Sequence, residues 1–180
     1  AKPHAGKAIV IKTDLKDFFP SIHYSRIRGY FIALGYSYPV ATILSVLMTE
    51  PPRQRVEAEG RTYHVPVGSR VCVQGAPTSP GISNALLLRL DRRLAGLARN
   101  QGYVYTRYAD DITLSGEEPA GIKIILSLIT RIVEEEGFHI NSEKTRILRR
   151  GQRQQVTGVN TNNKQVGLSR KERRRLRAAI

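Results

Sequence analysis

Apolar and polar residues follow one another in patterns that predict both strands and helices in the first half of the chain. An apolar, β-branched run over 8–14 that ends in Asp14 predicts a buried strand. The other predicted elements are helices over 25–34 and 39–48, a hairpin over 61–73 that turns around Pro66 and Gly68, and a helix over 81–99 with leucines at helical spacing.

The second half has the same mixed character. Its predicted elements are strands over 103–108 and 112–114, a helix over 119–136, a strand over 145–148, a hairpin of 155–159 with 165–168 that turns at Asn162-Asn163, and a final basic helix for which Ser169 provides the N-cap. Gly137 is expected to end the helix over 119–136. This order predicts an α+β fold, an antiparallel sheet with helices on one face.

Composition limits the classes of protein that fit this pattern. The 180 residues suffice for a hydrophobic core, and no apolar run is long enough to cross a bilayer. The single cysteine, Cys72, excludes an internal disulfide, and with no secretion signal in view we expect a cytoplasmic protein.

Positive charge is concentrated near the end of the chain. The formal net charge is +14, of which residues 149–180 carry +9. An excess of this size favours a polyanionic partner, nucleic acid above all, although a solvated basic face or an acidic membrane surface would also fit.

Acidic residues stand at two predicted strand ends. Asp14 ends the first strand, and Asp110-Asp111 lie at the predicted hairpin tip. Taken singly, such residues are common turn and cap residues. Gathered together, three carboxylates would repel one another unless divalent cations lay between them, which is the arrangement of two-metal phosphoryl transfer.

Four motifs in order resemble those of reverse transcriptases. The motifs are Thr13-Asp14-Leu15-Lys16-Asp17-Phe18-Phe19-Pro20-Ser21-Ile22, Gln74-Gly75-Ala76-Pro77-Thr78-Ser79-Pro80, Tyr108-Ala109-Asp110-Asp111 and Gly137-Phe138-His139-Ile140-Asn141-Ser142-Glu143-Lys144-Thr145. Val156-Thr157-Gly158 and Ala1-Lys2-Pro3-His4 resemble two further motifs, those of retron reverse transcriptases in particular.

The resemblance implies a polymerase palm with partial fingers and the beginning of a thumb. The implied division is palm at 1–36 and 78–150, fingers at 37–77, a hairpin resembling a primer grip at 151–168, and the start of a thumb at 169–180. A first fingers segment and most of a thumb are missing from this pattern, so we expect a truncated chain that by itself lacks activity.

The resemblance also implies residue roles. Asp14, Asp110 and Asp111, with the Leu15 carbonyl, would hold two Mg²⁺ ions, for which Mn²⁺ could substitute, and Lys144 would stabilise the leaving pyrophosphate. Phe19 would exclude the ribonucleotide 2′-hydroxyl, beside Gln74 and Gly75 at the incoming deoxynucleotide. The nucleic-acid contacts implied are Tyr108, Ser79, Pro80, Val156, Thr157, Gly158, Arg170, Lys171, Arg173, Arg174, Arg175 and Arg177. Plain packing for Phe19, a helix start for Ser79-Pro80 and a surface position for Lys144 are the structural alternatives.

The predicted function is therefore RNA-directed DNA synthesis of the retron type. Its predicted partners are an RNA template, an RNA–DNA duplex, deoxynucleoside triphosphates, a dedicated structured RNA and an effector protein linked to phage defence. The alternatives are a group II intron or diversity-generating reverse transcriptase, an RNA-dependent RNA polymerase that Phe19 disfavours, and a non-catalytic RNA-binding palm module.

Overall fold

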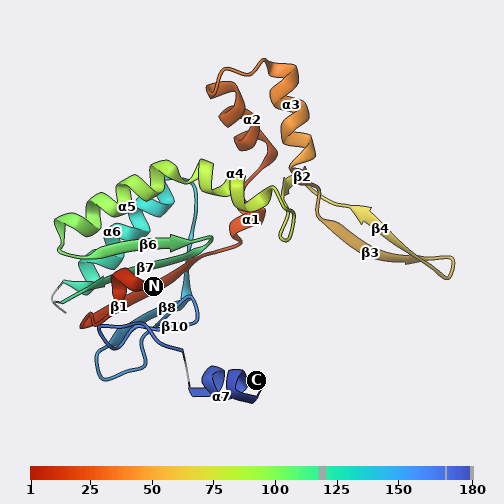
Figure 1. Ribbon diagram of the computed structural model, residues 1–180. Coiled ribbons are helices and arrows are strands. Elements are labelled where there is room, and N and C mark those ends of the chain that lie inside the picture. Colours follow the sequence, from red (N-terminus) through yellow and green to blue (C-terminus); the bar gives the residue numbers. More distant parts are fainter. Residues whose placement is uncertain (118–120, 169, 179–180) are drawn as a thin grey trace. The chain divides into compact units, whose positions relative to one another are not determined.

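A computed structural model describes residues 1–117, 121–168 and 170–178. The chain divides into two compact units, one formed by Ala1–Lys16 with Arg89–Ile180 and the other by Asp17–Leu88. Figure 1 labels their elements. The functional division into palm, fingers and thumb remains a prediction.

The first unit is built on an antiparallel sheet of four strands in the order β6-β7-β1-β8. Its strands are β1 (Ile9–Leu15), β6 (Val104–Tyr108), β7 (Asp111–Gly116) and β8 (Ile140–Arg149). Its helices are η1 (Lys2–His4), α5 (Leu88–Asn100), α6 (Ile122–Glu135) and α7 (Arg170–Ala178). Only the first residue of α5, Leu88, belongs to the second unit. Two short strands, β9 (Gln155–Val156) and β10 (Val159–Asn160), form a separate hairpin.

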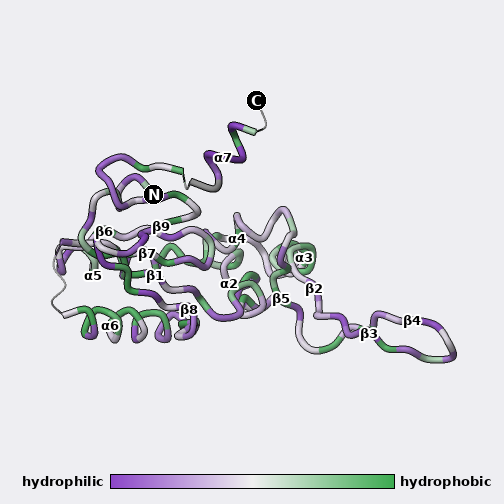
Figure 2. The backbone as a smooth tube through the Cα atoms, turned by 90° about the horizontal axis from the view of Figure 1, so that it is seen from below, coloured by the Kyte–Doolittle hydropathy of each residue, from purple (hydrophilic) through white to green (hydrophobic). Residues whose placement is uncertain are grey.

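Helices cover one face of this sheet, as the sequence predicts. Ile11 and Leu114 are opposite each other and are fully buried on that face. The apolar side of α6, including Ile125 and Ile129, is buried as well. Figure 2 shows α6 along one side of the sheet and the N-terminal segment with β9 on the other. The second face is therefore the one that remains available to polar chemistry.

The second unit holds the remaining elements. They are α1 (Phe18–Ser21), α2 (Tyr24–Ala33), α3 (Tyr38–Leu47), β2 (Thr49–Glu50), β3 (Arg53–Ala58), β4 (Arg61–Pro66), β5 (Val71–Cys72) and α4 (Ser79–Leu86). In this unit α2 and α3 pack together, and the Arg28 guanidinium lies over the rings of Tyr24 and Tyr38, 5.0 and 4.9 Å from their centroids.

The predicted hairpin over 61–73 is wrong in position. The hairpin pairs β3 with β4 and turns at Glu59-Gly60, whereas Val71–Cys72 pairs with Thr49–Glu50. Glu59 and Gly60 both have positive φ, 51° and 71°, as a two-residue hairpin turn requires. A glutamate in that place is a weaker sequence signal than Pro66, which ends β4, and Gly68, which follows it.

Two other predictions are corrected in their bounds. The helix over 81–99 is two helices, because the backbone leaves helical geometry at Leu87, with φ −90° and ψ 2°, while leucine spacing continues. The strand predicted over 145–148 runs over Ile140–Arg149. The start of the helix predicted over 119–136 lies outside the described residues, and so does the predicted N-cap Ser169. Gly137 ends the helix predicted over 119–136, with a φ of 75°, as predicted.

The hairpin predicted at 155–168 is tighter than expected. β9 and β10 turn at Thr157-Gly158, whose φ values are 47° and 81°. Asn160 then pairs with Gly167 through two backbone hydrogen bonds of 2.8 and 3.0 Å, so the predicted strand of 165–168 takes part in a second pairing around Asn162-Asn163.

Among the described residues, no helix combines the length and the apolar character needed to cross a bilayer. Cys72 is buried, and burial raises the pKa of its thiol.

Candidate active site

Two of the three predicted catalytic carboxylates face each other across adjacent strands. The register of β1 and β7 pairs Asp14 with Asp111. The Leu15 amide donates a 3.0 Å hydrogen bond to the Asp110 carbonyl, so the Asp14–Asp111 pair is one without hydrogen bonds of its own. Side chains approach each other most closely at such pairs. These two acidic side chains therefore lie on the same face of the sheet.

The third carboxylate belongs to the turn next to them. Ala109 and Asp110 connect Tyr108 to Asp111, and Ala109 has a positive φ of 52°, which is uncommon for a residue with a side chain. Within the described ranges, no three His, Cys, Asp or Glu side chains form a group that could hold a metal ion. The sheet thus brings two predicted ligands together and leaves Asp110 beside them on the turn.

Each of the opposed carboxylates has a lysine partner. Lys144 Nζ lies 3.4 Å from Asp14 Oδ2, and Lys12 Nζ lies 3.0 Å from Asp111 Oδ2. Lys144, whose side chain is 62% exposed, therefore lies beside a predicted catalytic carboxylate. Lys12 is a residue that the motif comparison missed, although its place two positions before Asp14 on a strand puts both on one face.

A bulge in β8 shapes this side of the site. The register between β1 and β8 shifts between Lys12 and Asp14, after which Asp14 is opposite Asn141. At the bulge the hydroxyls of Thr13 and Thr145 lie 2.7 Å apart, within hydrogen-bonding distance. Bulges often redirect side chains beside active sites. This one joins the motif around Asp14 to the motif around Lys144.

An ion pair between buried Arg107 and partly exposed Asp91 holds the predicted catalytic hairpin from the helix side. Arg107 donates to both carboxylate oxygens of Asp91 on α5, at 2.8 and 2.7 Å, and to the Ala109 carbonyl at 2.9 Å. Tyr105 also donates to Asp91, at 2.7 Å. Burial opposes ionisation of Asp91, but the hydrogen bonds from Arg107 and Tyr105 hold its pKa below the usual value.

His4 fixes the N-terminal segment to the same hairpin. The His4 ring is fully buried, with Nδ1 2.7 Å from the Ser115 hydroxyl and Nε2 2.8 Å from the Thr106 hydroxyl. Burial lowers the pKa of His4 to about 4, so the ring is neutral near pH 7. The retron-like motif that ends in His4 is thus part of the support of β6 and β7.

The predicted nucleotide-binding residues lie in the second unit. Phe19 is half-buried, and its ring packs against that of buried Phe18 with 5.0 Å between centroids. Gln74 and Gly75 are exposed, and Gly75 has a φ of 92° that favours glycine. Their roles toward a nucleotide remain predictions.

Burial divides the predicted nucleic-acid contacts. Tyr108, Pro80, Thr157 and Gly158 are exposed. The Ser79 hydroxyl is buried and donates to the Val73 carbonyl at 2.6 Å, which favours the structural alternative for Ser79, a helix start.

Val156 is also buried, so its side chain belongs to the core. The same hairpin is anchored by Gln154, whose side-chain amide donates to the carbonyls of Ala8 and Leu148 at 3.3 and 3.2 Å.

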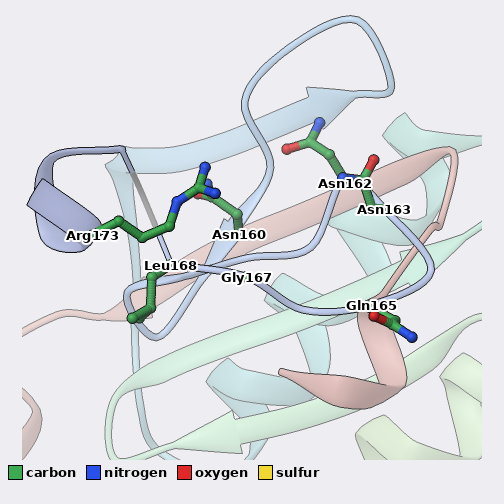
Figure 3. Close-up of a pocket in the computed structure, with 7 residues that line it drawn as sticks. All are labelled: Asn160, Asn162, Asn163, Gln165, Gly167, Leu168 and Arg173. Carbon is green, nitrogen blue, oxygen red and sulfur yellow. The ribbon is translucent and has the colours of Figure 1, made fainter. Parts of the chain in front are cut away.

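The predicted basic helix borders a polar pocket. α7 contains the predicted contacts Arg170, Lys171, Arg173, Arg174, Arg175 and Arg177. The pocket holds about 260 Å³ and is lined by Asn160, Asn162, Asn163, Gln165, Gly167, Leu168 and Arg173. Figure 3 shows Arg173 extending from α7 along this pocket. Its volume is below the roughly 300 Å³ at which small-molecule pockets begin.

Comparison with known families identifies the family to which these motifs belong. A family model described as reverse transcriptase (RNA-dependent DNA polymerase) matches residues 1–166. The chain belongs to the reverse transcriptase family.

Curated relatives confirm the resemblance to retron reverse transcriptases. The chain is 63% identical over its full length to the retron Mx65 reverse transcriptase of Myxococcus xanthus, and it covers 42% of that protein. It is 45% identical to the retron Mx162 reverse transcriptase of the same organism, covering 40% of it, and 32% identical to the retron Ec86 reverse transcriptase of Escherichia coli, covering 51%. The chain thus spans about half the length, or less, of these relatives.

Two solved telomerase structures share the fold. A telomerase from Candida albicans in complex with a fragment of telomeric RNA has a TM-score of 0.64 at 12% identity, over 90% of this chain and 30% of that one. An apo telomerase from Candida tropicalis has a TM-score of 0.60 at 14% identity, over 89% of this chain and 35% of that one. The predicted palm-type α+β fold is therefore confirmed.

Proposed function

We propose that this chain is the catalytic palm of a retron-type reverse transcriptase, which adds deoxynucleotides to a primer 3′-hydroxyl on an RNA template. The observation that carries the proposal is the cross-strand pairing of Asp14 with Asp111, beside the turn that holds Asp110. Like charges opposite each other destabilise a sheet. The presence of two opposed carboxylates within the matched motifs is best explained by a role for their negative charge.

The opposed carboxylates suit the divalent metal ions that reverse transcriptases use. Both side chains are only partly exposed, 25% for Asp14 and 21% for Asp111, and oxygen donors favour hard cations. We propose Mg²⁺, replaceable by Mn²⁺, with Asp14, Asp110, Asp111 and the Leu15 carbonyl as ligands. Bound there, two such ions would supply charge stabilisation for in-line phosphoryl transfer.

Other residues of the chain would position the metal ligands and the reacting groups. Arg107 holds the Ala109 carbonyl and so fixes the turn that bears Asp110. Lys144, at Asp14, would stabilise negative charge that develops on the pyrophosphate. In the second unit, Phe19, Gln74 and Gly75 would contact the deoxynucleotide, with the Phe19 ring against the sugar.

Charge supports nucleic acid as the partner of the first unit. The second unit, Asp17–Leu88, contains six Arg and Lys and four Asp and Glu, a net +2, so the first unit carries the other +12 of the +14. We propose that α7 and the exposed turn of Thr157 and Gly158 contact the backbone of an RNA–DNA duplex, which requires phosphate contacts rather than base reading.

The retron assignment extends to the partners. By similarity to the retron relatives, we propose a dedicated structured RNA as template and primer source, an effector protein, and a bacterial cytoplasmic setting in which deoxynucleoside triphosphates are available. Synthesis on the structured RNA, compared with an unrelated primed RNA, distinguishes this assignment from the group II intron and diversity-generating classes.

Deoxynucleotide incorporation on a primed RNA by the full-length protein tests the proposal. We expect incorporation that requires Mg²⁺ or Mn²⁺ and falls by at least about a hundredfold in Asp14→Asn, Asp110→Asn and Asp111→Asn. Glu117→Gln is the matched control, because it removes one exposed carboxylate that pairs with Lys7. RNA binding without any incorporation would instead support a non-catalytic RNA-binding palm module.

A further inference from the structure

Lys12 is the residue whose role the known motifs leave open. It lies on β1 two positions before Asp14, and its ammonium is 3.0 Å from Asp111 Oδ2. Both partners are largely shielded, with side-chain exposures of 26% and 21%. An ion pair of this kind is stronger than a surface pair, because solvent screens it less.

Thr113 completes the surroundings of the same carboxylate. Thr113 is directly opposite Lys12 in the register of β1 and β7, and its buried hydroxyl donates to Asp111 Oδ1 at 3.3 Å. Each oxygen of Asp111 therefore has one partner: a neutral hydroxyl on Oδ1 and a cation on Oδ2.

A metal ion and the Lys12 ammonium have opposite requirements at Asp111 Oδ2. The ammonium neutralises the carboxylate, whereas a divalent cation needs the charge and a lone pair of the same oxygen. The register of β1 with β8 pairs Lys12 with Arg146, so Lys12 has a second positively charged residue as its neighbour on the β8 side. Repulsion between these cations and an incoming metal ion lowers metal affinity.

We propose that Lys12 is a built-in competitor for the divalent cation at Asp111, which sets the free metal concentration at which the site fills. The ammonium leaves Oδ2 as the cation binds and returns when the cation departs. This inference rests on the part of the proposed function that makes Asp111 a metal ligand, and it adds a residue that regulates metal occupancy.

A Mn²⁺ titration of the full-length protein tests the proposal without a polymerase assay. Electron paramagnetic resonance of the free ion measures how much Mn²⁺ is bound. We expect Lys12→Gln to lower the Mn²⁺ dissociation constant by about tenfold. Lys12→Arg, which keeps the charge, is expected to stay near the original value. Lys7→Gln is the matched control, since Lys7 has a similar exposure of 29% and pairs with Glu117, 3.0 Å away.

A purely structural role of Lys12 predicts the opposite result. If Lys12 only aligned the carboxylate, Lys12→Gln would bind Mn²⁺ more weakly, and that outcome, or an unchanged affinity in a variant with normal circular dichroism, overturns the proposal. Lys12→Met replaces Lys12→Gln where the amide disturbs folding. In an Asp111→Asn background the gain from Lys12→Gln is expected to vanish.

Parallel measurement of DNA synthesis separates the two proposals. If Lys12→Gln binds Mn²⁺ more tightly but the unsubstituted protein synthesises no DNA, the proposed polymerase function is wrong and the competitor role of Lys12 stands. Normal synthesis with no tightening of Mn²⁺ binding would remove the competitor role and keep the polymerase function.

Discussion

Arg107 of β6 and Asp91 of α5 are joined by two hydrogen bonds of 2.8 and 2.7 Å, and the same guanidinium donates to the carbonyl of Ala109 in the turn that bears Asp110. The Arg107 side chain is only 5% exposed. A helix on the covered face of the sheet is thus connected through one side chain to the backbone between Tyr108 and Asp110.

Loss of this pair is expected to destabilise the protein. Asp91→Asn leaves the Arg107 charge buried without its counter-charge, so we expect the free energy of unfolding in urea to fall by about 2–4 kcal/mol. Glu57→Gln, which breaks the exposed pair with Arg55, is the control and should change it by less than about 0.5 kcal/mol. Equal effects of both substitutions would contradict a structural role for the buried pair.

Because His4 is buried, we expect the stability of the protein to depend on pH at values above those at which carboxylates titrate. Its pKa is about 4 in the folded chain, against the ordinary histidine value of 6.5 once the chain unfolds, so at pH values between them the unfolded chain binds a proton that the folded chain does not. Stability contributed by neutral His4 is present above pH 6.5 and is lost as the pH falls toward 4.

Urea unfolding at about pH 7.5 and about pH 5 measures this effect, which we expect to be about 2 kcal/mol. His4→Gln should remove most of that difference, whereas His64→Gln, at an exposed histidine, should preserve it. A pH dependence that persists unchanged in His4→Gln would show that other groups cause it.

Thr157 has a φ of 47°, which is costly for a β-branched side chain. Asparagine tolerates this conformation better, so Thr157→Asn should raise the free energy of unfolding by about 1 kcal/mol. Thr62→Asn, on an exposed strand outside the positive-φ residues, is the control and should give no gain. Urea unfolding of both variants checks the difference.

Phe19 is predicted to exclude ribonucleotides. With the ring removed in Phe19→Ala, the preference for deoxynucleotides over ribonucleotides, measured as a ratio of kcat/KM values, should fall by at least about tenfold. Phe18→Leu is the control, because Phe18 is buried and its loss should lower stability rather than selectivity. Unchanged discrimination in Phe19→Ala would remove Phe19 from this role.

The arginines of α7 should contribute to binding of an RNA–DNA duplex through phosphate contacts. A variant with glutamine at four of them should reduce the slope of log affinity against log salt by about 3 and weaken binding to all sequences alike. These four are Arg173, Arg174, Arg175 and Arg177.

The control for that variant carries glutamine at the arginines of the exposed β3–β4 hairpin, which are Arg53, Arg55 and Arg61. Fluorescence anisotropy with a labelled duplex at several salt concentrations compares the two. A similar loss of slope in both variants would show that the charge acts through the net charge of the protein and not through α7.

The sequence by itself determined the motifs, the α+β order of elements and the placement of Asp14 and Asp111 at strand ends. Local signals suffice for these features, because strand and helix periodicity and the residues of a short turn depend on neighbours in the chain. The family followed from the same motifs, and their match over residues 1–166 confirms it.

Only the tertiary structure decided which strands are neighbours and what surrounds the carboxylates. The register of β1 with β7 puts Lys12 at Asp111, and the pairing of β1 with β8 puts Lys144 at Asp14. Pairing between strands distant in the sequence sets these contacts, and a shift of one residue would turn every side chain of β1 to the other face. Periodicity along the chain indicates which side chains share a face, but it does not specify which strands become neighbours.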